Sequence, residues 1–173
     1  MAGSEQITAV TEEKEAWLDA RLPLEGLAER VQQIDRGFSI QDVKPIGFPY
    51  LLCSFGWEYR KFLHQRREIM HCCVDRCQGV STTIESVVLG EALEGAYLPA
   101  PTLDDASLER HAKRHVMQSR RHGLKRRDSA KVVIEKVLHL RKPLWEVSAH
   151  HPQYGDHSLL LDGVTGGHLF LNH

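Results

Sequence analysis

The sequence has no dominant charge and no long apolar run. Its 173 residues carry 22 Lys and Arg against 23 Asp and Glu, which gives a formal net charge of -1. Proteins that bind nucleic acid over most of their surface are strongly basic. No apolar run approaches the roughly 18 residues of a membrane-spanning helix. The first thirty residues have neither a basic start nor an apolar stretch, so we expect no secretory signal and a cytoplasmic location without membrane contact.

The motifs of common enzyme classes are also missing. The sequence has no phosphate-binding loop, no H-E-x-x-H zinc motif, no G-x-S-x-G nucleophile elbow and no glycine-rich dinucleotide turn. We therefore expect a protein without a cofactor that is more readily interpreted as non-enzymatic. A small metal-dependent or hydrolytic enzyme is the least supported hypothesis.

Cysteine is scarce, and its distribution allows two interpretations. Of the four cysteines, three lie within six residues of one another. A chain without a secretory signal is expected to keep them reduced. Together with a histidine they form a candidate metal site, Cys53, His71, Cys73 and Cys77, although zinc sites usually bring two closely spaced ligand pairs. The alternative is that these cysteines are small core residues on strands.

Capping residues and hydrophobic periodicity predict four helices. An acidic run beginning at Thr11 and extending to Leu18 is typical of the first turn of a helix. A stripe of apolar residues at helical spacing then predicts a second helix that ends at Gly37. The capping-box spacing of residues 82–85 predicts a short third helix. The fourth follows Thr102 and runs to about His122.

Aromatic and β-branched residues predict strands in two regions. Six of the twelve aromatic residues lie between Phe48 and Phe62, and such enrichment favours strands. The expected strands are residues 50–55 and 69–74, paired antiparallel, and later 132–140, 143–147, 158–162 and 168–171. The polar residues 60–68 are either the connection between the first two strands or the exposed ends of both, and residues 132–140 also permit a helix.

The two strand-rich regions share a pattern that suggests an internal repeat. Pro49 opens a strand, a polar stretch follows, and a second strand ends in Asp75-x-x-x-Gly79; Pro143 and Asp162-x-x-x-Gly166 repeat this order. Since a helix over a small sheet is only marginally stable, two such units would join. We therefore predict an α+β fold of two related helix-plus-antiparallel-sheet units sharing one core, divided into residues 1–96 and 97–173. The two aspartates could form a carboxylate pair, but an Asp before Gly more often caps its own turn.

The last unit resembles a known family. Pro143-Leu144-Trp145-Glu146-Val147-Ser148, followed by Leu159 to Gly167, looks like the closing hairpin of PepSY-type domains, over about 35 residues. The resemblance implies a small αβ module that binds or regulates rather than an enzyme.

A basic segment follows the acidic residues 81–109. Residues 110–127 contain eight Lys and Arg residues and no acid. All eight are candidate residues for binding a partner or nucleic acid: Arg110, Lys113, Arg114, Arg120, Arg121, Lys125, Arg126 and Arg127. On a helix, several of them would form a cationic ridge suited to phosphates. The alternatives are a solvated helix face and electrostatic pairing with an acidic segment.

These observations predict a non-enzymatic cytoplasmic interaction or assembly module that binds protein. The opposed acidic and basic segments favour a homodimer, because they offer complementary surfaces. The alternative is a nucleic-acid-binding accessory protein that uses residues 110–127.

Overall fold

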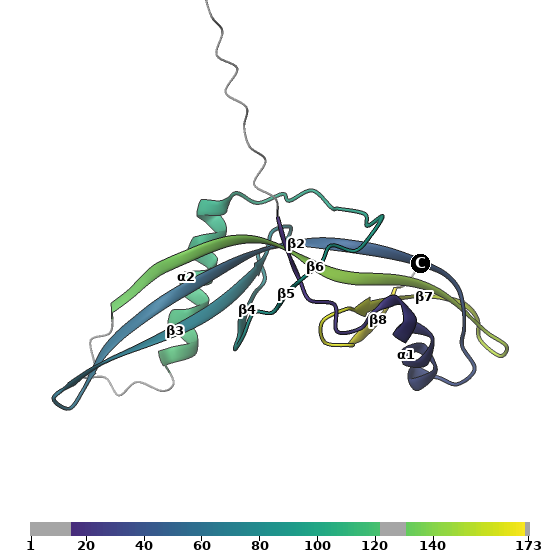
Figure 1. Cartoon of the computed structure of the whole chain (residues 1–173), viewed down its shortest axis with the longest axis horizontal. Coiled ribbons are helices and arrows are strands. Elements are labelled where there is room, and N and C mark those ends of the chain that lie inside the picture. Colours follow the sequence, from purple (N-terminus) through teal and green to yellow (C-terminus); the bar gives the residue numbers. More distant parts are fainter. Residues whose placement is uncertain (1–14, 122–130, 172–173) are drawn as a thin grey trace, which may run out of the picture.

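The structure is a computed structural model that describes residues 15–121 and 131–171, apart from the side chains of residues 120 and 121. Within these ranges, eight strands form one mixed sheet that is accompanied by two α-helices (Figure 1). In chain order the elements are β1 (Ala16–Leu18), a 3-10 turn (Leu24–Gly26), α1 (Leu27–Ile34), β2 (Ser39–Lys61), β3 (His64–Asp75), β4 (Ser81–Ile84), β5 (Leu89–Gly90), α2 (Asp105–Arg121), β6 (Lys131–His151), β7 (Gly155–Asp162) and β8 (His168–Leu171).

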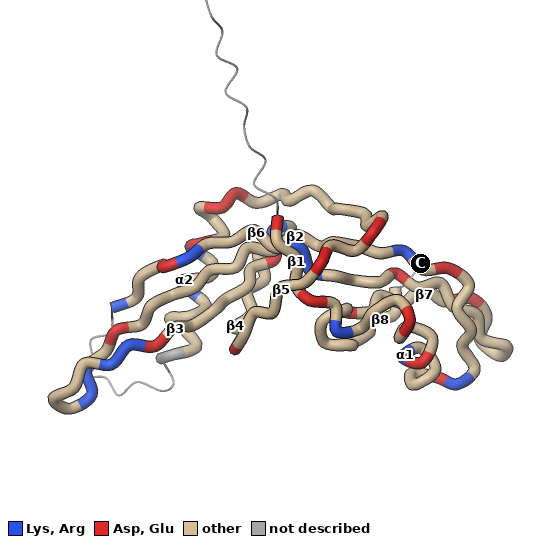
Figure 2. The backbone as a smooth tube through the Cα atoms, in the orientation of Figure 1, with Lys and Arg blue, Asp and Glu red and all other residues tan. Residues whose placement is uncertain are grey.

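Two long antiparallel strands span the molecule. β2 has 23 residues and β6 has 21, and they pair from Ser39 opposite His150 to Glu58 opposite Lys131. The ribbon is bent into an arch, and the end of the β2–β3 hairpin projects from one side of it (Figures 1 and 2). Two register irregularities, between Ile40 and Asp42 and between Ser54 and Phe55, interrupt the pairing, and such bulges increase local twist and bend.

β2 and β6 each have one edge that faces away from the other, and the pairing partner on that edge changes near the middle of the strand. β2 pairs with β3 from Tyr50 onward and makes one parallel bridge from Ile46 to Tyr97. β6 pairs in parallel with β1 at Leu140, and with β7 from Leu144. Pro49 and Pro143 lie where one partner gives way to the next, so their missing N–H groups interrupt no continuous ladder.

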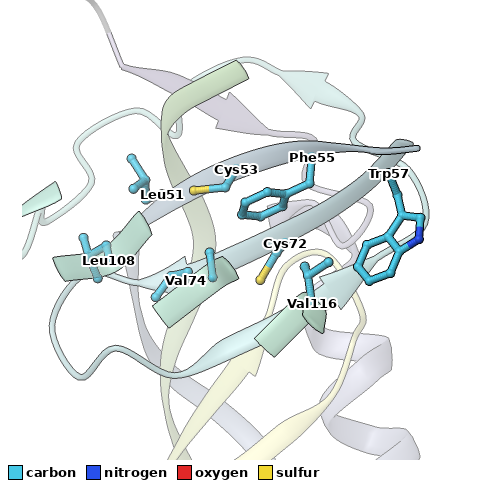
Figure 3. Close-up of a cluster of buried hydrophobic side chains, with 9 residues drawn as sticks. Leu51, Cys53, Phe55, Trp57, Cys72, Val74, Leu108 and Val116 are labelled. Atoms are coloured by element: carbon cyan, nitrogen blue, oxygen red, sulfur yellow. The ribbon is translucent and has the colours of Figure 1, made fainter. Parts of the chain in front are cut away.

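We call the part formed by α2, β3, β4 and the β2 and β6 residues beside them the α2 wing. Alternate β2 residues, among them Cys53 and Phe55, pack with β3 against α2 (Figure 3). From α2 come Leu108, Ala112 and Val116, all fully buried. Their spacing of three to four residues places them on one helix face, which explains why this helix lies on the sheet.

The α1 wing comprises α1, β7, β8 and the opposite halves of β2 and β6. Leu27 and Val31 of α1 pack on Val147 of β6 and on Leu159 and Leu161 of β7. Each helix therefore covers the hairpin that the other helix precedes in the chain: α1 leads into β2 but covers β6 and β7, and α2 leads into β6 but covers β2 and β3.

This arrangement shows that the predicted fold class, α+β with two related helix-plus-antiparallel-sheet units around one core, is wrong. The described residues are sheet-dominated, with 53% in strands and 18% in helices, and their strands form a single mixed sheet. The buried apolar residues form three clusters, two beneath the helices and a third around Leu52, Cys73 and Leu140. The physical reason is the length of β2 and β6, because strands that cross both wings leave no boundary between separate sheets.

The two hairpins nevertheless have the same register. Tyr50 pairs with Asp75, and Leu144 pairs with Asp162 in the corresponding place. The Oδ1 atom of Asp75 accepts the N–H groups of Cys77 and Gln78, and Oδ1 of Asp162 accepts those of Val164 and Thr165. Gly79 and Gly166 both have a φ of 76°, which favours glycine. Each aspartate thus caps its own turn.

Three local predictions differ from the structure. Residues 16–18 form strand β1 rather than the helix expected over Thr11–Leu18, whose first residues lie outside the described ranges. Residues 81–84 form strand β4, because Thr82, Thr83 and Ile84 are β-branched and pair with β3. The two strands expected on either side of Pro143 are one continuous strand.

Candidate functional site

The basic helix has its cations on the surface. Arg110, Lys113 and Arg114 are exposed, on the side of α2 away from the buried residues. Arg120 and Arg121 lie in the last turn of α2, and Lys125, Arg126 and Arg127 lie outside the described residues. The ridge expected from the sequence is therefore described over its first half.

The candidate metal ligands are not brought together. Cys53 is buried beneath α2, whereas Cys73 belongs to the cluster on the other face of the sheet. His71 Nδ1 lies 2.8 Å from the hydroxyl of Ser54, and Cys77 lies in the turn after β3. In the described ranges, no group of three or more His, Cys, Asp or Glu side chains could hold a metal ion.

The buried thiols have raised pKa values. Burial raises the pKa of Cys53 to about 12 and that of Cys73 to about 12, with smaller contributions from neighbouring groups. Burial likewise raises the pKa of Cys72 to about 11. Since the thiolate is the form that binds metals and attacks electrophiles, these cysteines are unreactive at neutral pH. They act as small core residues.

The most exposed apolar side chains lie at the end of the β2–β3 hairpin. Phe62 and Leu63 form its two-residue turn and are 89% and 86% exposed. Phe62 has a φ of 57°, and no other non-glycine residue in the described ranges has a positive φ. A large aromatic side chain in this region of backbone space costs stability, and a side chain that is 89% exposed recovers little of that cost by burial.

Cations surround this turn. The flanking Arg60, Lys61, His64, Arg66 and Arg67 are all exposed, and residues 59–67 contain no acid; Lys and Arg positions are blue in Figure 2. Arg67 pairs with Glu135 of β6, and the hydroxyl of Tyr59 donates a 2.9 Å hydrogen bond to Glu68. These contacts fix the base of the hairpin, while Arg60, Lys61 and Arg66 have no ion-pair partner among the described residues. We call residues 60–67 the hairpin tip.

The sequence prediction missed the hairpin tip as a site. The sequence allows residues 60–68 to be either the connection or the exposed ends of both strands, and the structure shows strand ends on both sides of a Phe62-Leu63 turn. The signal that could have revealed it was Phe62-Leu63 between two basic pairs, since exposed apolar residues at a turn are unusual.

A second surface feature is a hollow of about 440 Å³ on the α1 wing. We call it the proline pocket. Its lining is mainly apolar and comprises Ala20, Pro23, Leu24, Glu25, Val43, Pro45, Ala92, Leu93, Glu94 and Trp145. Trp145 is 5% exposed and donates a 2.9 Å hydrogen bond from Nε1 to the carbonyl of Leu22, which fixes the indole ring.

Buried ion pairs join the elements at the centre of the arch. Arg141 of β6 donates to Glu15 and to the carbonyls of Gly47 and Pro99. Arg76 lies 3.5 Å from Glu15 and 3.7 Å from Asp105 of α2. Both arginines are less than a tenth exposed. We interpret this network as structural, because its charges are matched and it joins β6, α2 and the residues before β1.

A smaller hollow of about 200 Å³ lies beside β1 and β4. Its charged lining residues are Asp19, Arg21 and Lys142, and Lys142 forms an ion pair of 2.5 Å with Asp162. Burial raises the pKa of Tyr50 to about 12, and the carboxylates of Asp75 and Asp162 add to this. The lining therefore combines a neutral phenol with one acid, Asp19, one base that has no ion pair within the described residues, Arg21, and the already paired Lys142, which favours no particular ligand charge.

Comparisons with protein-family models, curated proteins and solved structures find no match. The resemblance of the C-terminal residues to PepSY-type domains accordingly stays a prediction. Within residues 15–121 and 131–171, neither helix has the length and apolar character needed to cross a membrane.

Proposed function

We propose that this chain is a non-enzymatic interaction module that binds a protein partner through the hairpin tip. The observation that carries the proposal is the exposure of Phe62 and Leu63 on a hairpin whose base is fixed. Apolar residues near the centre of an interface, surrounded by polar groups, supply much of the binding energy in protein complexes. The four free cysteines are consistent with the proposed cytoplasmic location.

The hairpin tip selects for a particular kind of protein surface. Phe62 and Leu63 require an apolar recess, and the unpaired Arg60, Lys61 and Arg66 require acidic groups around it. Because the two strands of the tip pair up to Lys61 and His64, binding loses less conformational entropy than binding by an unpaired segment would.

Site-specific photo-crosslinking in cells tests this proposal. A photoreactive phenylalanine analogue at position 62 is expected to form a protein adduct. The same analogue at Val80, which is 58% exposed in the turn after β3, serves as the matched control. Equal yields from the two positions would show that the tip is no more an interface than any other exposed site. An adduct that nuclease digestion removes would also contradict a protein partner.

A second candidate function is nucleic-acid binding, which the cations of the α2 wing favour. The hairpin tip and α2 place Arg60, Lys61, Arg66, Arg110 and Lys113 on the surface of the same wing. An exposed aromatic at a basic hairpin turn also resembles the wedges that some proteins insert between bases. Fluorescence anisotropy with labelled double- and single-stranded probes at low salt tests this candidate. It requires binding that weakens steeply as salt rises.

A further inference from the structure

One surface of this chain has the chemistry that a partner of the hairpin tip must have. The tip needs an apolar recess large enough for Phe62 and Leu63, with carboxylates at its rim. The proline pocket has a volume of about 440 Å³, within the usual range of about 300–1,000 Å³ for binding pockets. Its walls include Pro23, Val43 and Pro45, and the buried ring of Trp145 supplies an aromatic surface.

The charges of the pocket complement those of the tip. Glu25 and Glu94 line the pocket, and both are exposed. Neither carboxylate has an ion-pair partner among the described residues, which leaves both available to cations from another molecule. Arg60, Lys61 and Arg66 of the tip are unpaired in the same sense. Opposite charges around an apolar centre favour this pairing and disfavour a polyanion at the pocket.

The tip of a given molecule does not reach its own pocket. The tip ends the α2 wing, whereas Pro23 and Trp145 belong to the segments around α1 and the second half of β6 (Figure 1). β2 and β6 pair continuously between these places, so the ribbon holds them apart. A tip that fills a proline pocket must therefore come from a second copy of the chain.

We propose that the hairpin tip of one molecule inserts Phe62 and Leu63 into the proline pocket of another. This inference rests on the proposed function and names its partner as a second copy. Two copies related by a two-fold axis would each supply one tip and one pocket, so that the exchange is reciprocal and the assembly closes as a dimer. Two contacts then form together, which raises the overall affinity above that of either one.

Analytical ultracentrifugation of the purified chain tests the proposal over about 1–300 µM, a range that covers dissociation constants of ordinary homodimers. Phe62→Ser/Leu63→Ser removes the apolar tip, and Ala92→Arg places a cation at the exposed rim of the pocket. Each variant should raise the dissociation constant about tenfold or more, as expected when central interface residues are lost. Ile69→Ser is the matched control, because Ile69 is 55% exposed on the same hairpin but away from its tip.

Two further measurements identify the contact itself. An equimolar mixture of the tip variant and the pocket variant keeps one intact tip and one intact pocket, so it should associate more strongly than either variant alone. Arg66→Glu and Glu94→Arg should each weaken association, and the chain that carries both should recover it. These results do not depend on one substitution leaving the fold intact, since the recovered association is itself the readout.

The outcomes separate this inference from the proposed function. A wild-type chain that stays monomeric across the concentration range overturns the second copy as partner. So does a dimer that the tip and pocket variants leave unchanged. In either case, an adduct in cells between position 62 and a different protein would leave the proposed function standing. The absence of a protein adduct at position 62 would remove both.

Discussion

The two hairpins of the sheet share a register but end differently. From Pro49 to Asp75 the chain is seven residues longer than from Pro143 to Asp162, and the additional residues extend the β2–β3 hairpin. The β6–β7 turn is tied to its own wing: His151 Nδ1 accepts the N–H groups of Gln153 and Tyr154, and its Nε2 lies 3.2 Å from Asp35 Oδ1. The longer hairpin has no such anchor at its turn. The end of the β2–β3 hairpin packs on no other described part of its own wing, so it is available for contact with another molecule.

The centre of the arch shows a second difference between equivalent positions. In the register shared by the hairpins, Arg76 corresponds to Gly163 and Arg141 to Gly47. The two arginines carry the ion network. A Cβ added to Gly47 would lie 2.4 Å from the ring of Trp17, so glycine at this position allows the indole to lie against the strand. Positions that are equivalent in the two hairpins thus hold a buried arginine in one case and a glycine in the other.

The largest expected effects come from the cores beneath the two helices. Leu108→Ala in the α2 wing and Leu27→Ala in the α1 wing remove almost fully buried side chains. Each should lower the free energy of unfolding by about 2–5 kcal/mol. Because β2 and β6 cross both wings, each variant should shift a single transition in chemical denaturation followed by circular dichroism and tryptophan fluorescence.

Val80→Ala is the control for these variants, since Val80 is 58% exposed. Two separated transitions, with only one moved by each substitution, would show that the wings unfold independently. The continuous ribbon would then not couple them.

Arg141→Ala tests the asymmetry at the centre and should have the next largest effect. Its loss removes the donor to the carbonyls of Gly47 and Pro99 and leaves Glu15 with Arg76 alone. We expect a loss of about 1–3 kcal/mol in the free energy of unfolding, because Glu15 is partly exposed and water can replace some of the interaction. Lys136→Ala, an exposed cation on the same strand, should change stability little. A loss no greater than that of the control would mean that the network adds nothing.

The capped turn at Asp162 should make the stability of the fold depend on pH. Burial opposes ionisation of Asp162, but hydrogen bonds from Lys142 and from the N–H groups of Thr165 and Val164 outweigh it and lower the pKa of this carboxyl. A carboxyl with a lowered pKa in the folded state contributes stability above its unfolded pKa, near 4, and loses it as pH falls through the folded value. Asp162→Asn should thus cost about 1 kcal/mol at pH 7.

The difference between wild type and Asp162→Asn should narrow below pH 4, measured by urea unfolding across pH. Lys142→Met should reduce the same pH dependence, since it removes a main cause of the lowered pKa. If the difference in free energy of unfolding between wild type and Asp162→Asn stayed constant down to pH 2, the effect would come from the shape of the side chain rather than from its charge.

The smallest effect is expected at the hairpin tip. Phe62→Gly should raise the free energy of unfolding by about 0.5 kcal/mol, because glycine adopts a φ of 57° without strain. Leu63→Gly is the matched control; its φ is not positive, so glycine there should lower stability slightly. If Phe62→Gly destabilises as Leu63→Gly does, the tip stores no strain. In ultracentrifugation, Phe62→Gly should weaken association. The same substitution should therefore make the fold more stable and the dimer less stable.

The strand positions were more predictable than the sheet. Aromatic and β-branched enrichment located the strands around Tyr50 and Cys72, and the helical spacing of Leu108, Ala112 and Val116 matches the buried face of α2. Residues 82–85 were misassigned because capping-box spacing is a local signal, and pairing with β3 outweighs it. The duplication suggested by the prolines and aspartates stays a proposal, which equal register and equal turns support.

The sequence by itself determined which side chains are apolar and at what period, and hence most strands, the face that α2 buries and the two aspartate-capped turns. It also determined that Phe62 and Leu63 stand among cations, although their exposure did not follow from that pattern. Only the tertiary structure decided that β2 and β6 pair over some twenty residues, from Ser39 and His150 to Glu58 and Lys131, that each helix covers the other hairpin, and that Pro23, Leu93 and Trp145 meet around one pocket. These features depend on contacts between residues far apart in the chain, whose energies local periodicity does not contain.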